Sequence, residues 1–257
     1  MDASARLNAL RTILSREIRR IMRIWGQTLV PPAITMLLYF VIFGNLVGSR
    51  IGEMGGMRYI DYIVPGLIMM SVIQNSYGNI VSSFFGSKFG RYVEEMLVSP
   101  MPPWVILTGY VLGALARGLM VGAIVLVIAM FFTRIQIHHV WITLSTFVLT
   151  ATVFALAGFI NAVYAKKFDD ISIVPTFVLT PLTYLGGVFY SVDLLPDFWE
   201  AVSHANPILY MVNAFRYGLL GTTDVDLRIA YAVMVGFAVV LAFVSLRLLT
   251  KGVGMRS

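Results

Sequence analysis

Apolar residues recur along the chain in six long runs, and most of the charged residues lie in the short segments between them. A bilayer span needs roughly 20 apolar residues, because the hydrocarbon core is about 30 Å thick and a helix rises about 1.5 Å per residue. Backbone groups in lipid must be hydrogen bonded within the protein, so each run is predicted to be a helix. The sequence therefore predicts an all-α membrane protein, one domain over residues 1–257, with transmembrane helices at about 27–47, 62–85, 104–132, 140–164, 171–190 and 227–249.

The segment before the first run, residues 1–25, has the pattern of an amphipathic helix. An apolar stripe recurs at steps of three and four residues: Leu7, Leu10, Leu14, Ile18, Ile21 and Trp25. The arginines of the segment fall mostly on the other side: Arg16, Arg19, Arg20 and Arg23. We expect this interfacial helix to lie in the cytoplasmic headgroup layer. It either anchors the topology alone or also contacts a cytoplasmic partner.

Composition and charge agree with a membrane protein. Of the residues, 58% are hydrophobic and 12% are charged, where a soluble domain has about 25% charged residues. Few of the 19 Lys and Arg residues lie on one side of the predicted membrane, in or beside the segments that join the first span to the second, the third to the fourth and the fifth to the sixth. They are Arg50, Arg58, Arg134, Arg216 and Arg228. The positive-inside rule then predicts that both termini are cytoplasmic. The net charge of +6 is assigned to the membrane surface and not to nucleic acid.

Two connecting segments are predicted to form short helices. In the cytoplasmic loop 86–103, charged Arg91, Glu94 and Glu95 stand beside apolar residues such as Met96. This loop is either a docking helix for another protein or a solvated connector. In the external segment 191–226, helices are predicted to begin at Pro196 and at Asn206-Pro207. The segment is too apolar to be solvated and its helices are too short to cross, so we expect two re-entrant or capping outer helices.

Polar side chains inside the predicted spans are the candidates for function. The second span carries a polar face within about 140° of the helix circumference, and the fifth carries a thinner one; the candidates for a translocation path are Ser71, Gln74, Asn75, Asn79, Ser82, Thr180 and Tyr184. The alternative is ordinary hydrogen bonding between helices. Arg117 lies within the third span, and no acidic residue lies deep in another span to pair with it. It has either a structural or an anion-binding role.

Several kinds of chemistry are not encoded. None of the four lysines follows a glycine, as a P-loop requires. No His-Glu-x-x-His motif is present, so we expect no metal site of that kind, and the chain has no cysteine. We therefore predict no catalytic residue and no cofactor in this chain.

The run from Leu182 to Gly221 resembles the signature of ABC-2 type transport permeases. An apolar stretch with Gly186 and Gly187 precedes Leu195-Pro196, and a second proline with downstream polar residues follows: Pro207, Tyr210 and Arg216. The likeness extends over the six spans, the N-terminal helix and the stretch from Glu94 to Pro100.

This resemblance implies the permease half of an ATP-driven exporter in the bacterial inner membrane. Two copies would pair with two copies of a separate P-loop ATPase that binds ATP and Mg. The loop after the second span would be the coupling helix on that ATPase, with contacts from Arg91, Glu94, Glu95 and Met96. The second and fifth spans of both copies would surround the path, and the outer helices would close it. The family's cargoes are polysaccharides, lipo-oligosaccharides, teichoic acids and drugs, and we expect a lipid-like or amphipathic cargo here. The alternatives are an ATP-independent channel or carrier, or a scaffold that transports nothing.

Overall fold

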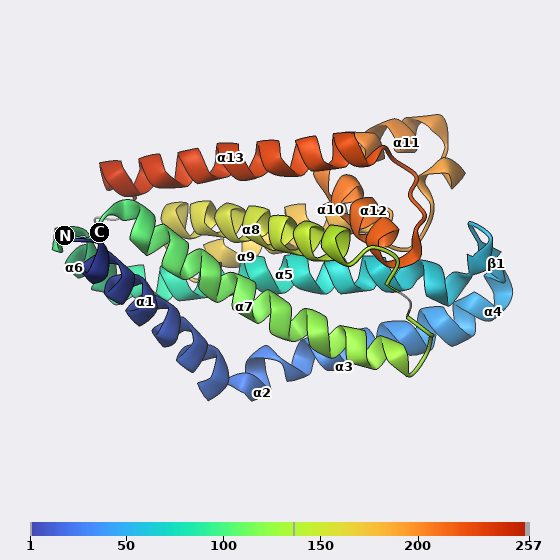
Figure 1. The fold of residues 1–257 in the computed structure, drawn as a ribbon, viewed down its shortest axis with the longest axis horizontal. Helices are drawn as coiled ribbons and strands as arrows, with labels where there is room; N and C mark the ends of the chain where they lie inside the picture. Colours follow the sequence, from blue (N-terminus) through green and yellow to red (C-terminus); the bar gives the residue numbers. More distant parts are fainter. Residues whose placement is uncertain (1, 136, 255–257) are drawn as a thin grey trace.

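The structure is a computed structural model that describes residues 2–135 and 137–254, and these residues are mostly helical, as predicted. Four long helices run along the long axis of the molecule (Figure 1): α5 (Tyr59–Phe89), α7 (Pro103–Met130), α8 (Val140–Tyr164) and α13 (Leu227–Lys251). The two ends of the described chain and the short helix α6 (Tyr92–Val98) lie at the same end of the long axis, which we call the α6 end. The opposite, hairpin end carries β1 (Glu53–Met54) and β2 (Met57–Arg58), which pair antiparallel.

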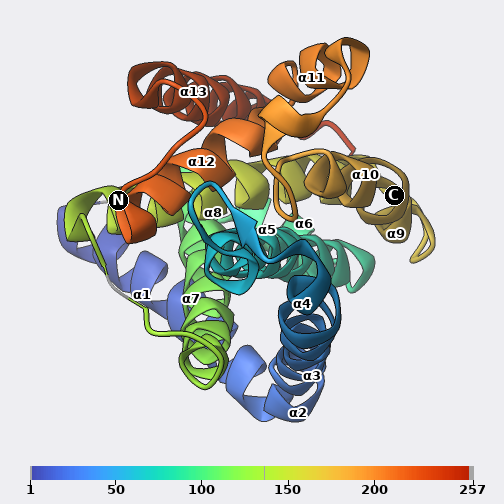
Figure 2. The same cartoon turned by 90° about the vertical axis from the view of Figure 1, so that its right-hand side faces the viewer.

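Four helical segments are long and apolar enough to cross a membrane: Trp25–Ile51, Pro103–Met130, Val140–Tyr164 and Leu227–Lys251. Helix α5 has 31 residues, but its polar residues lower its hydropathy. It packs against α7, α8 and α12 and lies near the centre of the bundle (Figure 2). A helix enclosed by protein does not need a lipophilic surface, which explains why α5 differs in composition from the four apolar segments named above.

The fifth predicted span is an interrupted helix. The segments α9 (Asp170–Val174), η2 (Pro175–Leu179, a π-helix) and α10 (Thr180–Tyr184) follow one another without a break. They end at Leu185, and a turn with Gly187 in the left-handed region (φ 68°) follows. This helical run is shorter than the roughly 20 residues that a straight span needs. The count of six spans therefore stays a prediction.

The first predicted span begins after a bend. It consists of α2 (Trp25–Thr28), α3 (Val30–Tyr39), the π-helix η1 (Phe40–Val47) and α4 (Gly48–Ile51). Pro31 and Pro32 lie in the first turn of α3, where a missing backbone N–H breaks no helical hydrogen bond.

The predicted N-terminal helix is present as α1 (Ala3–Arg23), and the Asp2 side chain accepts a hydrogen bond from the backbone of Ala5. The side of α1 that is buried was predicted only in part. Leu7 and Trp25 are exposed, whereas Ile13, Glu17 and Ile21 are buried. Glycines on α7 permit this orientation, because a Cβ at Gly109 would lie 2.6 Å from Ile13 Cγ2 and one at Gly113 would lie 2.7 Å from Glu17 Cβ.

The segment 191–226 forms helices where the sequence predicts them. After η3 (Val192–Leu194), α11 spans Asp197–His204 and α12 spans Pro207–Leu220. Asn206 caps α12, since its side-chain oxygen accepts a 3.0 Å hydrogen bond from the Ile208 backbone. Helix α12 is largely buried, against α5, α8 and α13. Whether the pair re-enters a bilayer stays a prediction.

Candidate functional site

Helix α5 is buried along most of its length except for one line of residues spaced by four. We call this line the α5 stripe: Gln74, Gly78, Ser82 and Gly86. Gln74, Ser82 and Gly86 are exposed and Gly78 is half-buried. A Cβ added at Gly78 or Gly86 would meet no atom within 4 Å. The central helix thus presents a narrow surface of amide, hydroxyl and backbone groups.

The other polar residues of α5 lie inside the protein. Ser71, Asn75 and Asn79 are buried. The Asn75 side chain donates to the Ser71 carbonyl (2.9 Å) and accepts a hydrogen bond from Arg117 (3.1 Å). For Asn75 and Asn79 the structure shows hydrogen bonding between helices, which is the second of the two interpretations of the polar face. Only Gln74 and Ser82, among the predicted path residues of α5, are exposed.

Arg117 lies near the middle of α7 and joins three helical segments. Its guanidinium donates to the Asn75 side chain and, at 3.5 Å, to the carbonyl of Thr28 at the end of α2. Its Nε is buried without a hydrogen-bond partner, and no carboxylate pairs with it within the described part of the chain. An arginine at this depth of a membrane helix costs about 2.5–3.5 kcal/mol. Two neutral acceptors offset part of that cost.

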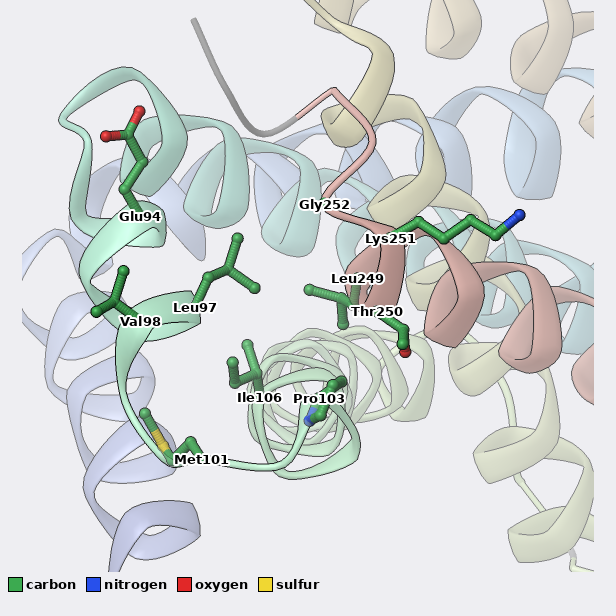
Figure 3. Close-up of a pocket in the computed structure, with 10 residues that line it drawn as sticks. All are labelled: Glu94, Leu97, Val98, Met101, Pro103, Ile106, Leu249, Thr250, Lys251 and Gly252. Carbon is green, nitrogen blue, oxygen red and sulfur yellow. The ribbon is translucent and has the colours of Figure 1, made fainter.

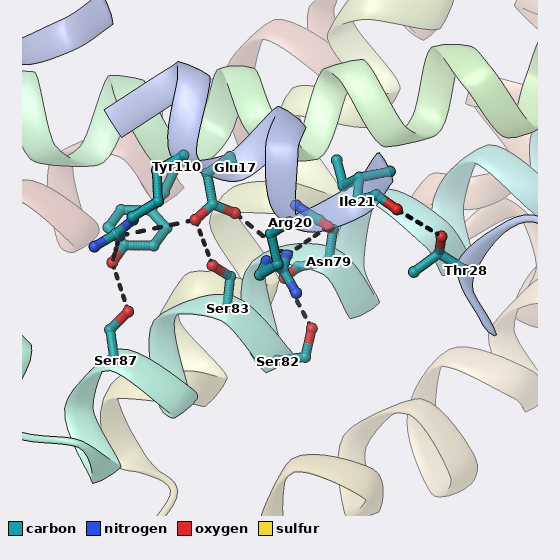
Figure 4. A network of polar contacts seen from close by, with 10 residues as sticks. Glu17, Arg20, Ile21, Thr28, Asn79, Ser82, Ser83, Ser87 and Tyr110 are labelled. Carbon is teal, nitrogen blue, oxygen red and sulfur yellow. Dashed lines mark hydrogen bonds and ion pairs between the residues drawn. The ribbon is translucent and has the colours of Figure 1, made fainter. Parts of the chain in front are cut away.

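A buried carboxylate fixes α1 to the bundle (Figure 4). Glu17 accepts a 2.6 Å hydrogen bond from Ser83 on α5 and a 3.2 Å charge-assisted bond from Arg20. Arg20 also donates to the side chain of Asn79, at 2.7 Å. Glu17 is a site residue that was not predicted from the sequence. Its spacing of four residues from Ile13 and from Ile21 is the signal that places it on the buried face of α1.

The same network continues toward the α6 end. Arg16 donates a 2.6 Å hydrogen bond to the hydroxyl of Tyr110 on α7, and this hydroxyl donates to Ser87 on α5. Arg16 and Arg20 were predicted to lie opposite the apolar stripe of α1, but both side chains point toward the bundle. Carboxylate, amide and hydroxyl acceptors on α1, α5 and α7 draw them there.

The first and fifth predicted spans meet through aromatic residues. The hydroxyl groups of Tyr39 and Tyr184 are 2.9 Å apart, and Phe189 stacks on Tyr184 with ring centroids 5.6 Å apart. Tyr184 remains 41% exposed. Thr180 is half-buried, and its hydroxyl donates to the Pro175 carbonyl within the helix. Of these two predicted path residues, Tyr184 is the more accessible.

Near the hairpin end, Arg216 holds α12 to its neighbours. It is fully buried and donates to the Gly187 carbonyl (2.6 Å) and to Asn213 (3.0 Å). Its guanidinium carbon lies 4.0 Å from the centre of the Tyr62 ring, and Asp224 is 3.7 Å away. Pro196 and Pro207 start their helices, and Tyr210 donates to the His204 carbonyl. These outer residues have structural contacts and do not form one open site.

At the α6 end, α6 is attached on one side and free on the other. Val93 is buried, and Met96 is partly buried in the same apolar cluster. Arg91, Glu94 and Glu95 are exposed and form no ion pair among the described residues. Arg91 adopts the left-handed conformation, with φ 62°, at the point where α6 begins. The predicted contact residues thus share a short, anchored helix.

A groove of about 640 Å³ lies beside this helix (Figure 3). Its walls are α6, the start of α7 and the end of α13, with Glu94 on one wall and Lys251 on the opposite one. Exposed apolar side chains continue the surface of α6, above all Tyr92 (58%) and Val98 (88%). Charged and apolar groups side by side on an anchored helix are typical of a protein-binding surface.

These features define a polytopic helical membrane protein, and comparison with known proteins identifies the family. Residues 8–220 match the family model described as ABC-2 type transporter. The chain therefore belongs to the ABC-2 type transporter family, as its signature-like run and six apolar segments suggested.

The relatives cover nearly the whole chain. It is 59% identical over 250 residues to the protein named inner membrane transport permease YadH of Escherichia coli strain K12, which covers 97% of each sequence. It is 25% identical over 216 residues to nodulation protein J of Rhizobium leguminosarum bv. trifolii, covering 84% of this chain and 82% of the relative. It is 24% identical over 206 residues to nodulation protein J of Sinorhizobium fredii, covering 80% and 79%.

Proposed function

We propose that this protein is the membrane-spanning subunit of an ATP-driven exporter in the bacterial inner membrane. Two copies associate around a path for an amphipathic substrate, and a separate P-loop ATPase supplies the energy. Each copy crosses the membrane six times, with both termini and α6 on the cytoplasmic side. Membership of the family supports the transporter class, and the printed name of its 59% identical relative supports an inner-membrane permease.

The observation that carries the proposal is the α5 stripe. Polar and backbone groups exposed to lipid are unfavourable, because the hydrocarbon offers them no hydrogen-bond partner. The stripe of Gln74, Gly78, Ser82 and Gly86 lies on the most enclosed long helix and still remains uncovered in one copy. A second copy, or a wet path between two copies, would cover it. Tyr184, beside the first predicted span, would line the same path.

The surface of α6 supports docking of an ATPase. Val93 is buried and holds the helix to the bundle, while the charged side chains of Arg91, Glu94 and Glu95 are exposed. A partner that binds ATP and Mg would transmit its conformational change through such a rigid contact. ATP shifts the equilibrium between arrangements of the dimer only through its differential affinity for them.

The test is isolation of the protein in a mild detergent. The expected result is a complex of two copies with two copies of a P-loop ATPase whose hydrolysis rate depends on the permease. A protein that is isolated alone, with full transport activity in its absence, would favour an ATP-independent carrier. A protein that is isolated alone and moves no compound would favour a scaffold.

A charge reversal localises the contact. The variant Glu94→Lys/Glu95→Lys is expected to insert and fold normally, because both side chains are exposed, but to lose the ATPase or its coupling. Glu53→Lys, an exposed reversal at the hairpin end, is the matched control and should bind the ATPase as the unchanged protein does. Normal coupling in the double variant would remove α6 from the interface.

A further inference from the structure

A second pocket, of about 290 Å³, lies where α2, α3, α5 and α7 meet. Its mouth is formed by exposed residues, among them Gln27, Thr35 and Gln74, and its floor by Asn75 and Arg117. Gln74 belongs to the α5 stripe, which we assign to the translocation path. The pocket therefore opens at the end of this stripe that is nearer the hairpin end. We call it the Arg117 pocket.

The floor of the Arg117 pocket has a positive charge that no acid among the described residues balances. No carboxylate lines it. The nearest buried acid of the polar network, Glu17, already accepts hydrogen bonds from Ser83 and Arg20. Arg117 itself donates only to two neutral oxygens, and its Nε has no partner in the described structure. The guanidinium can therefore accommodate a further acceptor.

The remaining polar groups of the pocket also favour an oxygen-rich anion. The Ser71 hydroxyl is buried without a hydrogen-bond partner. The Gln74 amide and the Thr35 hydroxyl stand at the mouth, where each can donate. A guanidinium presents parallel N–H groups that match the oxygens of a carboxylate or a phosphate. The pocket is at the small end of the range for ligand sites, so it fits a headgroup while an attached apolar chain stays outside.

We propose that the Arg117 pocket binds the anionic group, a phosphate or a carboxylate, of the transported molecule, and that the substrate class is an anionic amphiphile. This inference rests on the proposed function, since it takes the α5 stripe as part of the path. Arg117 would draw the headgroup out of the inner leaflet, and the apolar chain would follow along the lipid-exposed surfaces of α3.

Binding is measured on the purified chain without any ATPase, in an uncharged maltoside detergent. The probes are dioctanoyl phosphatidylglycerol, dioctanoyl phosphatidylcholine and glycerol phosphate, and the readout is affinity by thermophoresis with stoichiometry by native mass spectrometry. The expected result is one tight site per chain that prefers phosphatidylglycerol over phosphatidylcholine by at least about tenfold. Saturable binding of glycerol phosphate at that site would show that the free headgroup is sufficient; its absence would show that the acyl chain is also needed.

Two variants assign the site. Arg117→Gln and Gln74→Glu each lower the net charge by one, and each should weaken phosphatidylglycerol binding at least about tenfold. The second keeps the fold even if the first does not, because Gln74 is exposed. Arg247→Gln, which makes the same charge change at an exposed position of α13, should bind normally. Equal affinity for both lipids, or undiminished binding in Gln74→Glu, would overturn the inference. Since the assay contains no ATP, a failure of the exporter proposal would appear separately, in the isolation experiment.

Discussion

Arg20 on α1 and Asn79 on α5 are joined by a 2.7 Å hydrogen bond between side chains 59 residues apart in the sequence. One turn away on α5, Asn75 binds Arg117 of α7 in the same manner. Two amides at a spacing of four residues thus hold two guanidinium groups from different helices. A movement of the N-terminal helix would therefore be transmitted directly to the helix that carries the α5 stripe.

Loss of the buried carboxylate should loosen α1. In Glu17→Ala, Arg20 loses its acidic partner and Ser83 loses its acceptor. The expected decrease in the free energy of unfolding is about 2 kcal/mol. Thermal unfolding followed by tryptophan fluorescence in detergent measures it. Arg11→Gln, at an exposed position of the same helix, should unfold as the unchanged protein does; an unchanged unfolding temperature in Glu17→Ala would contradict the attachment of α1 through this network.

Two neighbouring amides on α5 should respond differently to substitution. Asn75→Leu leaves the half-buried Arg117 without its closest acceptor, and we expect a loss of about 1–3 kcal/mol of stability. Gln74→Leu removes an exposed side chain and should leave stability unchanged while it lowers the transport-coupled ATPase rate of the reconstituted complex. Equal destabilisation by the two substitutions would show that Gln74 also has a structural role.

Arg216 should not tolerate replacement by lysine. A lysine retains the charge but cannot donate to Gly187 and Asn213 together in the geometry of a guanidinium. Since the residue is fully buried, we expect Arg216→Lys to lose about 3 kcal/mol of stability. The control is Arg228→Lys, at an exposed position of the same end. If both variants unfold at one temperature, the contacts of Arg216 do not fix α12.

Gly66 is required by a close approach between α5 and the turn after α10. A Cβ at this position would lie 2.6 Å from the Val188 carbonyl oxygen and 2.8 Å from its Cα, so Gly66→Ala must displace the backbone of that turn. We expect reduced stability and a weaker Arg216–Gly187 contact. At Gly236 on α13 a Cβ meets nothing, and Gly236→Ala should stabilise the helix by about 0.5–1 kcal/mol. Unfolding curves that rank the two variants in the opposite order would refute this packing.

The pattern of apolar runs was sufficient to predict a helical membrane protein, the N-terminal helix and the starts of α11 and α12. Each of these depends on local signals, such as run length or the Asn206-Pro207 cap. The interruption of the fifth span was not predicted from run length, although Pro175 and Pro181 are its local signal: each lacks a backbone N–H for the helix, and each lies at the start of a new segment, Pro175 in the π-helix η2 and Pro181 in α10. Its geometry depends on packing against the other helices.

The sequence predicted which polar residues belong to the candidate site, but not which of them are covered by other helices. A helical wheel places Asn75, Asn79, Gln74 and Ser82 on one polar face, but it does not show that the arginines of α1 and α7 cover the two asparagines. Which of these polar residues are covered and which stay exposed depends on how α1 crosses α7. Gly109 and Gly113 permit that crossing through contacts distant in sequence. The spacing of Glu17 from Ile13 and Ile21 places it on the buried face of α1, whereas its hydrogen bond with Ser83 joins residues 66 positions apart and has no local signal.

The measurement that tests the central claim most directly is site-specific photo-cross-linking in living cells. A benzophenone amino acid replaces Tyr92, which is 58% exposed on α6, or Phe131, which is 82% exposed at the end of α7 toward the hairpin end. The account predicts an adduct between position 92 and a P-loop ATPase polypeptide, and no such adduct from position 131. Absence of the ATPase from the position 92 adducts, in cells where the protein is fully inserted, would contradict it.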